Sequence, residues 1–208
     1  MAETALDYLK IAASRGSKLG LERTFQLMER LGSPQESLPV IHIAGTNGKG
    51  SFGAMLSSVL RCAGYKVGGF SSPALTGITD SFRINGQEIS PRLLEEILEQ
   101  IIPHAEEMSD KPTEFEVLTA AAYQLFRQEG CDIAVVECGT GGDGDSTNVL
   151  SSPLLSVITN VQLDHAGFLG NSVAEIAVHK AGIIKPGAPC VVQDQPEIRI
   201  TPDTLHHV

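Results

Sequence analysis

Short, almost continuously apolar runs alternate along the chain with segments of helical periodicity, and this alternation restricts the fold more than any other feature. The apolar runs, which predict strands, lie at 40–44, 66–70, 133–138, 154–159 and 189–192. The segments that predict helices lie at about 20–31, 49–62, 90–101, 115–126 and 172–181. Strands that are apolar on both faces are typical of parallel sheets, because helices cover both sides. The sequence therefore predicts an α/β fold in which a parallel sheet carries helices on both faces.

The charge balance and the cysteines limit the partners and the compartment. The chain of 208 residues has 15 Lys and Arg against 25 Asp and Glu, a net charge of −10. That balance disfavours broad binding to nucleic acid or anionic lipid, although a local phosphate pocket is compatible with it. No stretch approaches the roughly 20 apolar residues of a membrane span, the first residues lack a signal-peptide core, and the 4 cysteines form no CxxC pair. We therefore expect a cytoplasmic, monomeric protein with small-molecule partners, no nucleic acid and no membrane.

A glycine-rich segment with the sequence GTNGKGS, Gly45–Ser51, stands between the first predicted strand and the helix that follows it. Glycines let successive backbone N–H groups turn toward one anion, and the helix dipole favours negative charge there. Lys49 supplies a positive charge, and Ser51 supplies a hydroxyl for phosphate or metal. The usual P-loop spacing is not met, because Ile43 stands where its first glycine is expected and Gly50 separates the lysine from the serine. A phosphate-binding loop is the favoured interpretation, and a glycine-rich turn with a solvated lysine is the alternative.

A second glycine cluster, Gly139–Gly144, follows the predicted strand at 133–138 and formally matches the GxGxxG pattern of dinucleotide-binding folds. Asp164 lies 20 residues further on, as that pattern requires. The pattern should also open a long helix, yet the chain continues with the polar segment 145–148 and then Pro153. We therefore interpret the glycines as a loop at the carboxyl end of a strand, where open α/β sheets bind their ligands.

Polar residues near the predicted strand ends form the next group of candidates. Glu137 ends an otherwise apolar strand, which suits either a carboxylate that reaches solvent or a magnesium ligand. His165 follows the next strand and is either a structural histidine or part of a site with Glu137. His179 and Lys180 lie on the predicted helix at 172–181, where composition alone favours a solvated face. These positions become functional candidates only if the fold brings them together.

Taken together, the motifs resemble folylpolyglutamate synthase/dihydrofolate synthase, a branch of the Mur-type ATP-dependent amide ligases. The matching blocks lie at 19–23, 41–51, 71–73, 115–119, 137–139, 141–142, 145–148, 163–165 and 179–185. Gly50, between Lys49 and Ser51, is typical of the folate branch rather than of the peptidoglycan ligases. The resemblance implies a P-loop NTPase-like, mostly parallel sheet with helices on both faces. It also implies that the chain lacks the C-terminal α/β domain of that family.

The family's reaction implies the substrates and the cofactors. ATP phosphorylates a substrate carboxylate, and the amine of L-glutamate attacks the acyl phosphate; the acceptor is dihydropteroate, a tetrahydrofolate glutamate or both. A carboxylate repels a triphosphate, so Mg²⁺ and loop donors must neutralise the developing charge. By resemblance we expect an ATP-dependent carboxylate–amine ligase of folate metabolism that uses ATP and Mg²⁺. Two alternatives remain, namely a nucleotide-binding module without ligase activity and a Mur-type ligase that acts on another carboxylate.

The resemblance also implies roles for individual residues. The phosphate-binding set is Thr46, Asn47, Gly48, Lys49, Gly50 and Ser51, and the metal set is Ser72, Glu137 and His165. The catalytic set is Lys49, Lys180 and His165, and Lys180 matches a lysine that is carbamylated in related ligases. The substrate set is Gly20, Leu21, Glu22, Thr113, Glu114, Phe115, Glu116, Gly144, Asp145 and Ser146. A pterin ring stacked on Phe115 is one expectation for that residue, and a place in the core is the other.

The sequence departs from the family pattern at a few places, and the chain is short. Ala74 stands where the family has His or Phe, and Asp80-Ser81-Phe82 replaces a motif that contains an arginine. We expect a helical lead over residues 1–37 that packs on the core, and an ATPase domain over 38–208 that is incomplete at its C-terminus. As the ATPase half of a longer enzyme type, the chain is expected to bind nucleotide weakly with Mg²⁺ and to ligate nothing alone.

Overall fold

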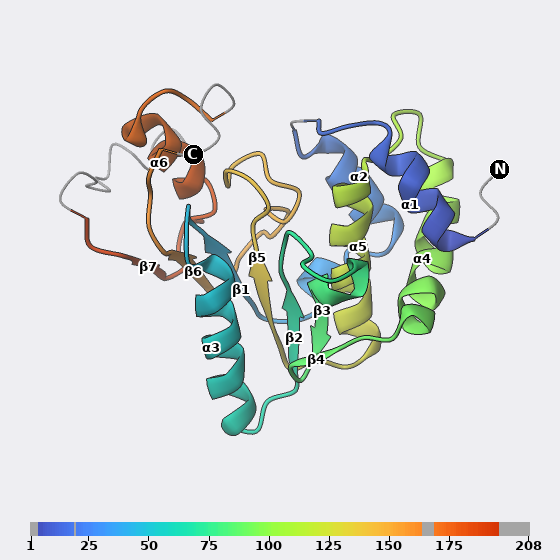
Figure 1. Cartoon of the computed structure of the whole chain (residues 1–208), viewed down its shortest axis with the longest axis horizontal. Coiled ribbons are helices and arrows are strands. Elements are labelled where there is room, and N and C mark those ends of the chain that lie inside the picture. The colour runs from blue at the N-terminus through green and yellow to red at the C-terminus, as the bar shows by residue number, and fades with distance from the viewer. Residues whose placement is uncertain (1–3, 19, 164–168, 196–208) are drawn as a thin grey trace.

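The computed structural model describes residues 4–18, 20–163 and 169–195, and its centre is a seven-stranded sheet (Figure 1). The strands are β1 (Val40–Ala44), β2 (Val67–Phe70), β3 (Phe82–Ile84), β4 (Gln87–Glu88), β5 (Ile133–Glu137), β6 (Leu155–Ile158) and β7 (Cys190–Val192). Their order in the sheet is β4-β3-β2-β5-β1-β6-β7. The neighbouring strands β2, β5, β1, β6 and β7 are parallel to one another. At the edge of the sheet, β3 pairs antiparallel with β2, and β4 pairs antiparallel with β3. The prediction of a mostly parallel sheet is confirmed.

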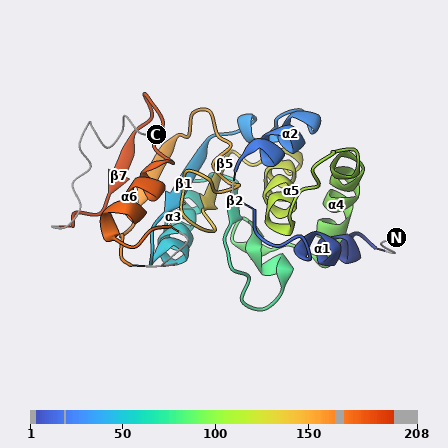
Figure 2. The ribbon, with the colours of Figure 1, turned by 90° about the horizontal axis from the view of Figure 1, so that it is seen from above.

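Helices cover both faces of this sheet. They are α1 (Ala5–Ala13), α2 (Glu22–Arg30), α3 (Lys49–Cys62), α4 (Pro91–Glu106), α5 (Glu114–Gln128) and α6 (Val173–Ala181), with 3₁₀ turns at Pro34–Glu36 and Ile78–Ser81. α3 lies on one face, whereas α1, α2, α4 and α5 gather on the other (Figure 1 and Figure 2). Ile176 of α6 joins a buried cluster with Ala44 and Ile158, at the carboxyl ends of β1 and β6. Within the described residues, no helix is long and apolar enough to cross a membrane.

Successive side chains of the central strands point to opposite faces of the sheet and join different hydrophobic clusters. In β1, Ile41 and Ile43 join the buried cluster against which α3 packs, whereas Val40 joins the cluster that contains α5. At Gly68 of β2, a Cβ would come within 2.5 Å of the Phe126 ring of α5, so helix and sheet approach this closely only because no side chain stands there. The strand pattern therefore places α3 and α5 on opposite faces, as the apolar runs predict.

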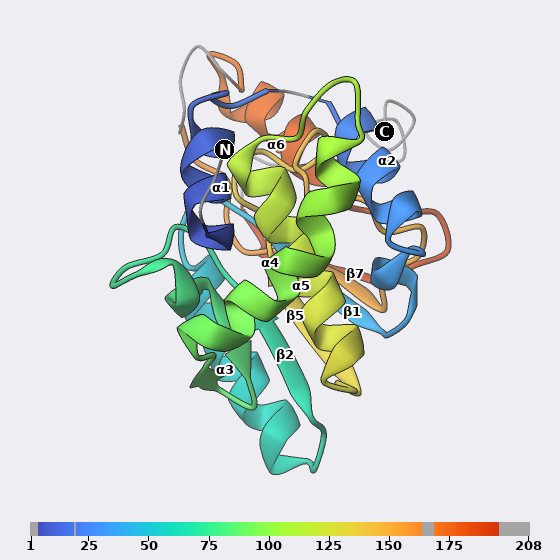
Figure 3. The same cartoon turned by 90° about the vertical axis from the view of Figure 1, so that its right-hand side faces the viewer.

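The N-terminal segment packs onto the helical face of the sheet. α1 and α2 flank α4 and α5 in Figure 3, and their buried residues share one hydrophobic cluster with those helices. Leu27 and Met28 of α2 are fully buried in it. Arg23 of α2 pairs with Glu116 of α5 at 2.9 Å, which ties the first turns of the two helices together. The division of the chain into a lead over 1–37 and a domain over 38–208 stays a prediction.

The predicted and observed elements agree except at two places. α3 has the predicted bounds, and α4 follows Ser90, whose hydroxyl accepts the N–H of Leu93. No separate helix was predicted at α1, although it lies within the expected helical lead over 1–37, and the β3–β4 hairpin was not predicted. Between the hairpin strands, Asn85 and Gly86 both have positive φ angles, of 52° and 75°. An Asn-Gly pair suits such a turn, so this dipeptide is the signal that the sequence offered for the hairpin.

Candidate functional site

The loop Gly45–Ser51 joins β1 to α3 at the carboxyl edge of the sheet, where β1 lies between β5 and β6. Gly45 has a φ of 150°, and a Cβ there would lie 1.9 Å from Oγ1 of Thr159. Gly48 has a φ of 80° and stands directly before α3. Residues other than glycine rarely adopt these conformations, so the backbone of the loop requires glycine at both positions.

The N-terminus of α3 differs from those of most other helices. Side-chain oxygens of Thr4, Ser90, Thr113 and Ser172 cap α1, α4, α5 and α6, whereas Gly48 gives α3 no side-chain cap. The first N–H groups of a helix have no partner within the helix, and the helix dipole adds positive potential there. A glycine loop that ends on such an N-terminus can hold a phosphate-sized anion.

Lys49 and Glu137 face each other beside the loop. The Lys49 Nζ donates to the carbonyl of Gly45 at 3.1 Å and lies 3.8 Å from Oε1 of Glu137. Glu137 ends β5, next to β1, and its side chain is 9% exposed. Burial raises the pKa of the Glu137 carboxyl, and the charge of Lys49 and the N–H of Ser72 oppose that rise. A buried carboxylate held near a lysine can accept a cation when the lysine turns toward a phosphate.

Ser72 adds a second oxygen close to Glu137. Its backbone N–H donates to the Glu137 carboxylate, and its hydroxyl oxygen is buried without a hydrogen-bond partner. An unpaired buried hydroxyl costs free energy, and oxygen ligands of these two kinds suit Mg²⁺. Ser72 and Glu137 therefore fit a divalent cation. His165, the third residue of the expected metal set, lies outside the described residues, as does Asp164.

Lys180 of α6 meets the same loop from the other side. The residue is 2% exposed, although composition alone favours a solvated position on its helix. Together with Gly45, Lys49 and the start of the second glycine cluster, it lines a small cavity of about 10 Å³. The fold thus brings the two lysines of the expected catalytic set to one place.

Two glycines allow this approach of α6 to the second glycine cluster. A Cβ on Gly142 would lie 2.5 Å from the His179 carbonyl oxygen, and one on Gly182 would lie 2.5 Å from the Cα of Asp143. The exposed His179 ring adds a contact of 2.8 Å between Nδ1 and Oδ2 of Asp143. The cluster forms a loop at the carboxyl end of β5 and no helix follows it up to β6, so the prediction of a strand-end loop, and not of a turn that opens a long helix, is confirmed.

A buried polar network lies under this second loop. Nε2 of His42, in β1, lies 2.8 Å from Oγ1 of Thr147, which donates to Asp145 at 2.5 Å. Asp145 also accepts the backbone N–H of Thr140 at 2.7 Å, so it fixes the shape of the glycine cluster. Burial lowers the pKa of His42 to about 3, and the charge of Lys185 adds to this effect. His42 is therefore neutral in the folded protein at physiological pH.

The neutral state of His42 makes stability fall as the pH is lowered below about 6.5. An unfolded chain takes up a proton near pH 6.5, whereas the folded chain resists until about pH 3. The expected contribution is a loss of about 2 kcal/mol in the free energy of unfolding between pH 7 and pH 5. Urea unfolding at several pH values measures it. The variant His42→Asn should be less stable at pH 7 but show a flatter pH dependence, and an equally steep profile would contradict the assignment.

Phe115, the first aromatic residue of α5, lies between the hydrophobic core and the second glycine cluster. Its ring stacks on Phe70 with centroids 6.0 Å apart, and a Cβ on Gly139 would lie 2.6 Å from its Cζ. The same Cβ would lie 3.3 Å from Oδ2 of Asp145. The fold therefore brings Phe115 and Asp145 to the same glycine, and Gly144 and Ser146 are the chain neighbours of Asp145 in that loop.

Glu116 and Thr113 have partners within the fold. The Glu116 carboxylate accepts from Nε of Arg23 at 2.9 Å and from the N–H of Thr113 at 2.6 Å. The Thr113 hydroxyl in turn accepts the N–H of Glu116, which completes a capping box at the start of α5. These two substrate candidates therefore also hold the start of α5 in place.

The remaining substrate candidates stand at the first turns of α2 and α5. Gly20 has a φ of 103°, and a Cβ there would lie 2.5 Å from the Glu22 carboxylate. Leu21 precedes α2 as its N-cap residue, and Glu114 is the first residue of α5. The Arg23–Glu116 ion pair holds these two helix starts next to each other.

The segment 159–162, at the end of β6, braces the phosphate loop, and none of its residues was among the predicted site residues. Asn160 accepts the N–H of Thr46 on its carbonyl, at 2.8 Å, and the N–H of Asn47 on its side-chain oxygen, at 2.7 Å. The Thr159 hydroxyl donates to the Asn47 carbonyl, and the Gln162 side chain accepts from the Asn47 amide. The carboxyl ends of parallel strands meet at one edge of the sheet, so the polar residues directly after the apolar strand β6 could have been predicted to lie near the loop that follows β1.

Comparison with known proteins agrees with this geometry. Residues 43–196 match the family model described as the Mur ligase middle domain. The dihydrofolate synthase/folylpolyglutamate synthase of Bacillus subtilis is 45% identical over 188 residues, which cover 88% of this chain and 44% of the relative. The solved structure of E. coli FolC in complex with DHPP and ADP has a TM-score of 0.85 at 36% identity, and the match covers 92% of this chain and 46% of that one.

A second solved structure, a bifunctional folylpolyglutamate synthase/dihydrofolate synthase with Mn, AMPPNP and L-glutamate bound, gives a TM-score of 0.83 at 36% identity, covering 92% of this chain and 48% of that one. The chain spans about half the length of the curated relatives that it matches. The sequence motifs, the fold and the relatives agree. The chain therefore belongs to the Mur ligase middle-domain family, and the relatives that it matches are folylpolyglutamate and dihydrofolate synthases, the branch that its motifs resemble.

Proposed function

We propose that the protein is the ATPase part of a ligase that adds L-glutamate to dihydropteroate, to tetrahydrofolate glutamates or to both. The observation that carries the proposal is the convergence of Lys49, Glu137 and Lys180 around one glycine loop at the start of α3. Such an arrangement suits transfer of a phosphoryl group to a carboxylate, because it offers donors for phosphate and a carboxylate for a metal. The names of the relatives support the substrate class.

In this proposal, the backbone N–H groups of residues 46–51 bind the β- and γ-phosphates of ATP. Lys49 turns from the Gly45 carbonyl to the phosphates, and Ser72 and Glu137 hold Mg²⁺ together with His165. The bound Mg²⁺ neutralises the negative charge that would otherwise keep a carboxylate away from the triphosphate. The buried, unpaired hydroxyl of Ser72 supports this donor set.

Two further roles complete the proposal. Lys180 is carbamylated, which converts a buried cation into an oxygen donor beside the phosphate loop; its burial next to Lys49 supports a role in the site. The acceptor binds between the start of α5 and the second glycine cluster, with a pterin ring on Phe115. The protein acts as a cytoplasmic monomer, and the 208-residue chain binds nucleotide without ligating when the remainder of the relatives' length is absent.

Calorimetric titration with the ATP analogue AMPPCP, with and without Mg²⁺, tests the nucleotide and metal site. We expect Mg²⁺ to tighten binding to the wild-type chain, because Glu137 and Ser72 hold the cation against the phosphates. Glu137→Gln removes the charge but keeps the size of the side chain. It should abolish most of the gain from Mg²⁺, about tenfold in affinity, and leave the Mg²⁺-free affinity nearly unchanged.

Glu99→Gln, on the exposed side of α4, is the matched control and should behave like the wild-type chain. A wild-type chain that binds equally well with and without Mg²⁺ would contradict the metal site. Glutamate-dependent release of ADP by the 208-residue chain with dihydropteroate would contradict the proposal that it does not ligate alone.

A further inference from the structure

The last turn of α6 carries Lys180, and the second glycine cluster and the residues just after it cap the carbonyl groups on either side of this lysine. The backbone N–H of Asp143 donates to the His179 carbonyl at 2.8 Å. The side-chain amide of Asn148 donates to the Gly182 carbonyl at 3.1 Å. The last carbonyl groups of a helix lack a partner in the next turn, so donors from another segment fix where that end of the helix lies.

Asn148 joins the loop to the helix from inside the fold. Its side-chain amide also donates to the Asp143 carbonyl at 3.1 Å, so a single NH₂ group bridges the loop and the end of α6. The residue is 2% exposed, and its backbone N–H donates to the Asp145 carbonyl at 2.8 Å. Buried hydrogen bonds are costly to break, because the freed carbonyl groups find no water. Asn148 therefore fixes the distance between the loop and the helix.

Asp143 and His179 close the same contact at the surface. A carboxylate only accepts hydrogen bonds, so Nδ1 of His179 donates to Oδ2 of Asp143, at 2.8 Å. The other oxygen of that carboxylate accepts the N–H of Gly144 at 2.7 Å, which holds the Asp143 side chain in place. We call Asp143, Asn148 and His179 the α6 clasp.

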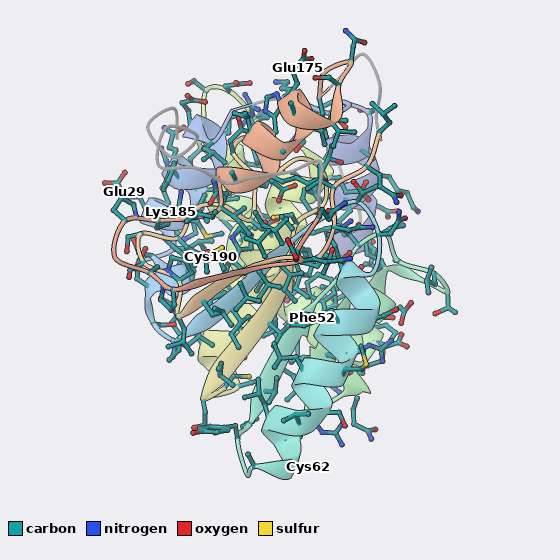
Figure 4. All side chains as sticks on the ribbon, turned by 90° about the vertical axis from the view of Figure 1, so that its left-hand side faces the viewer. Glu29, Phe52, Cys62, Glu175, Lys185 and Cys190 are labelled. Atoms are coloured by element: carbon teal, nitrogen blue, oxygen red, sulfur yellow. The ribbon has the colours of Figure 1, made fainter. Side chains whose placement is uncertain are left out.

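Hydrophobic contacts hold α6 on the sheet independently of the clasp. Ile176 and Ile183 are fully buried in the cluster that also contains Ala44. Figure 4 shows α6 at the top of the molecule, with Glu175 labelled at its outer end. Burial of apolar surface has no preferred direction, whereas a hydrogen bond needs its two heavy atoms within about 3 Å. The cluster can therefore retain α6, but the clasp is needed to place one side chain such as Lys180.

Lys180 lies directly against the loop that the clasp holds. A Cβ on Gly142 would lie 2.9 Å from the Cα of Lys180 and 3.0 Å from its carbonyl oxygen. The buried lysine also lines the cavity of about 10 Å³ that it shares with Gly45 and Lys49. A cavity of this volume holds about one water molecule, so a small shift of α6 changes what Lys180 can reach.

We infer that Asp143, Asn148 and His179 are positioning residues for Lys180, and that they act on the nucleotide site only through its side chain. The inference rests on the proposed function for the role of Lys180 beside the phosphate loop. A group that is displaced from its productive place loses much of its effect, even when the rest of the site is intact. Breaking the clasp should therefore have the same consequence as removing Lys180.

A double-mutant cycle on the binding of AMPPCP with Mg²⁺, measured by calorimetric titration, tests the inference. We expect Asn148→Ala to weaken binding about tenfold, and Lys180→Ala to weaken it at least as much. The double variant should bind no more weakly than Lys180→Ala, because the clasp then has no lysine to position. His179→Ala should weaken binding by a smaller factor. His179→Asn keeps a donor at the place of Nδ1 and should restore it.

The rate at which lysine amines are acetylated by acetic anhydride follows the place of Lys180 without any nucleotide. The reaction is read by mass spectrometry, in buffer free of carbon dioxide so that no carbamate blocks the amine. In the wild-type chain Lys180 should react far more slowly than the exposed Lys10. Asn148→Ala should raise the rate at Lys180 about tenfold, because the end of α6 opens locally, and leave Lys10 unchanged. Val178→Ala, on the exposed side of α6, is the matched control and should match the wild type in both measurements.

Losses of AMPPCP affinity that add up in the double variant would show that Asn148 acts on the fold in general, and would overturn the inference. An unchanged acetylation rate at Lys180 in a folded Asn148→Ala variant would overturn it as well. If Asn148→Ala does not fold, His179→Ala and His179→Asn decide the question by the same cycle. If the wild-type chain does not bind AMPPCP, the proposed function fails, and the acetylation rates alone decide whether the clasp holds Lys180.

Discussion

Replacing Lys49 with alanine is expected to weaken binding of AMPPCP about 10- to 100-fold, since a hydrogen bond to a charged group contributes about 1.5–3 kcal/mol. The Lys49 side chain donates to the carbonyls of Gly45 and Thr46 and lies near Glu137, all within the site. The substitution therefore removes the charge that faces the phosphates while leaving the packing of the core intact. Calorimetric titration of both proteins in Mg²⁺, with urea unfolding as a check on the fold, measures the effect.

Lys10→Ala, at the exposed end of an ion pair on α1, is the matched control and should bind AMPPCP as the wild-type chain does. Loss of Lys49 also removes a charge that opposes the raised pKa of Glu137, so that pKa should rise further. An alanine variant that binds the analogue as tightly as the wild type would remove the nucleotide assignment.

Replacing Glu116 with alanine is expected to lower the free energy of unfolding by about 2–4 kcal/mol, because it removes the buried carboxylate that Arg23 and Thr113 bind, although Arg23 keeps its contact with Asp110. The Glu116 side chain is 1% exposed and that of Arg23 is 11% exposed. The variant also loses the reciprocal bonds with Thr113 that cap α5. Urea unfolding followed by circular dichroism gives the loss directly.

Two variants show whether the burial of this ion pair matters. Glu116→Gln retains an oxygen that can accept the N–H of Thr113, so it should lose less stability than Glu116→Ala. Glu96→Ala breaks the exposed pair of Arg92 and Glu96 on α4 and should cost about 0.5 kcal/mol or less. A loss near that size for Glu116→Ala would show that the buried pair contributes no more than a surface pair.

The parts of the fold that the sequence predicts are those with strong local signals. The run 40–44 is apolar at every position, and the Ser90-Pro91 pair marks the start of α4. Thr4, with Asp7 three residues later, offers a start signal for α1, but no helix was predicted at these residues. The strands of the β3–β4 hairpin are too short to show an alternation of apolar and polar residues, so the Asn85-Gly86 turn is the sequence signal for it.

The residues of the candidate site also differ in how clearly the sequence marks them. Lys49 and its glycines are recognisable because the loop, the strand before it and the helix after it are contiguous in the chain. Glu137 is conspicuous as a carboxylate at the end of an apolar strand. Lys180 has no such signal, since a lysine on a short helix is ordinarily solvated, and its burial becomes visible only in the fold.

The sequence by itself therefore determined the α/β layering and the phosphate loop, because both depend on residues that are neighbours in the chain. Only the tertiary structure decided which distant residues meet at that loop. The order β2-β5-β1-β6 brings Ser72, Glu137 and Asn160 to one edge of the sheet, and Gly142 and Gly182 let α6 approach closely enough to bury Lys180 there.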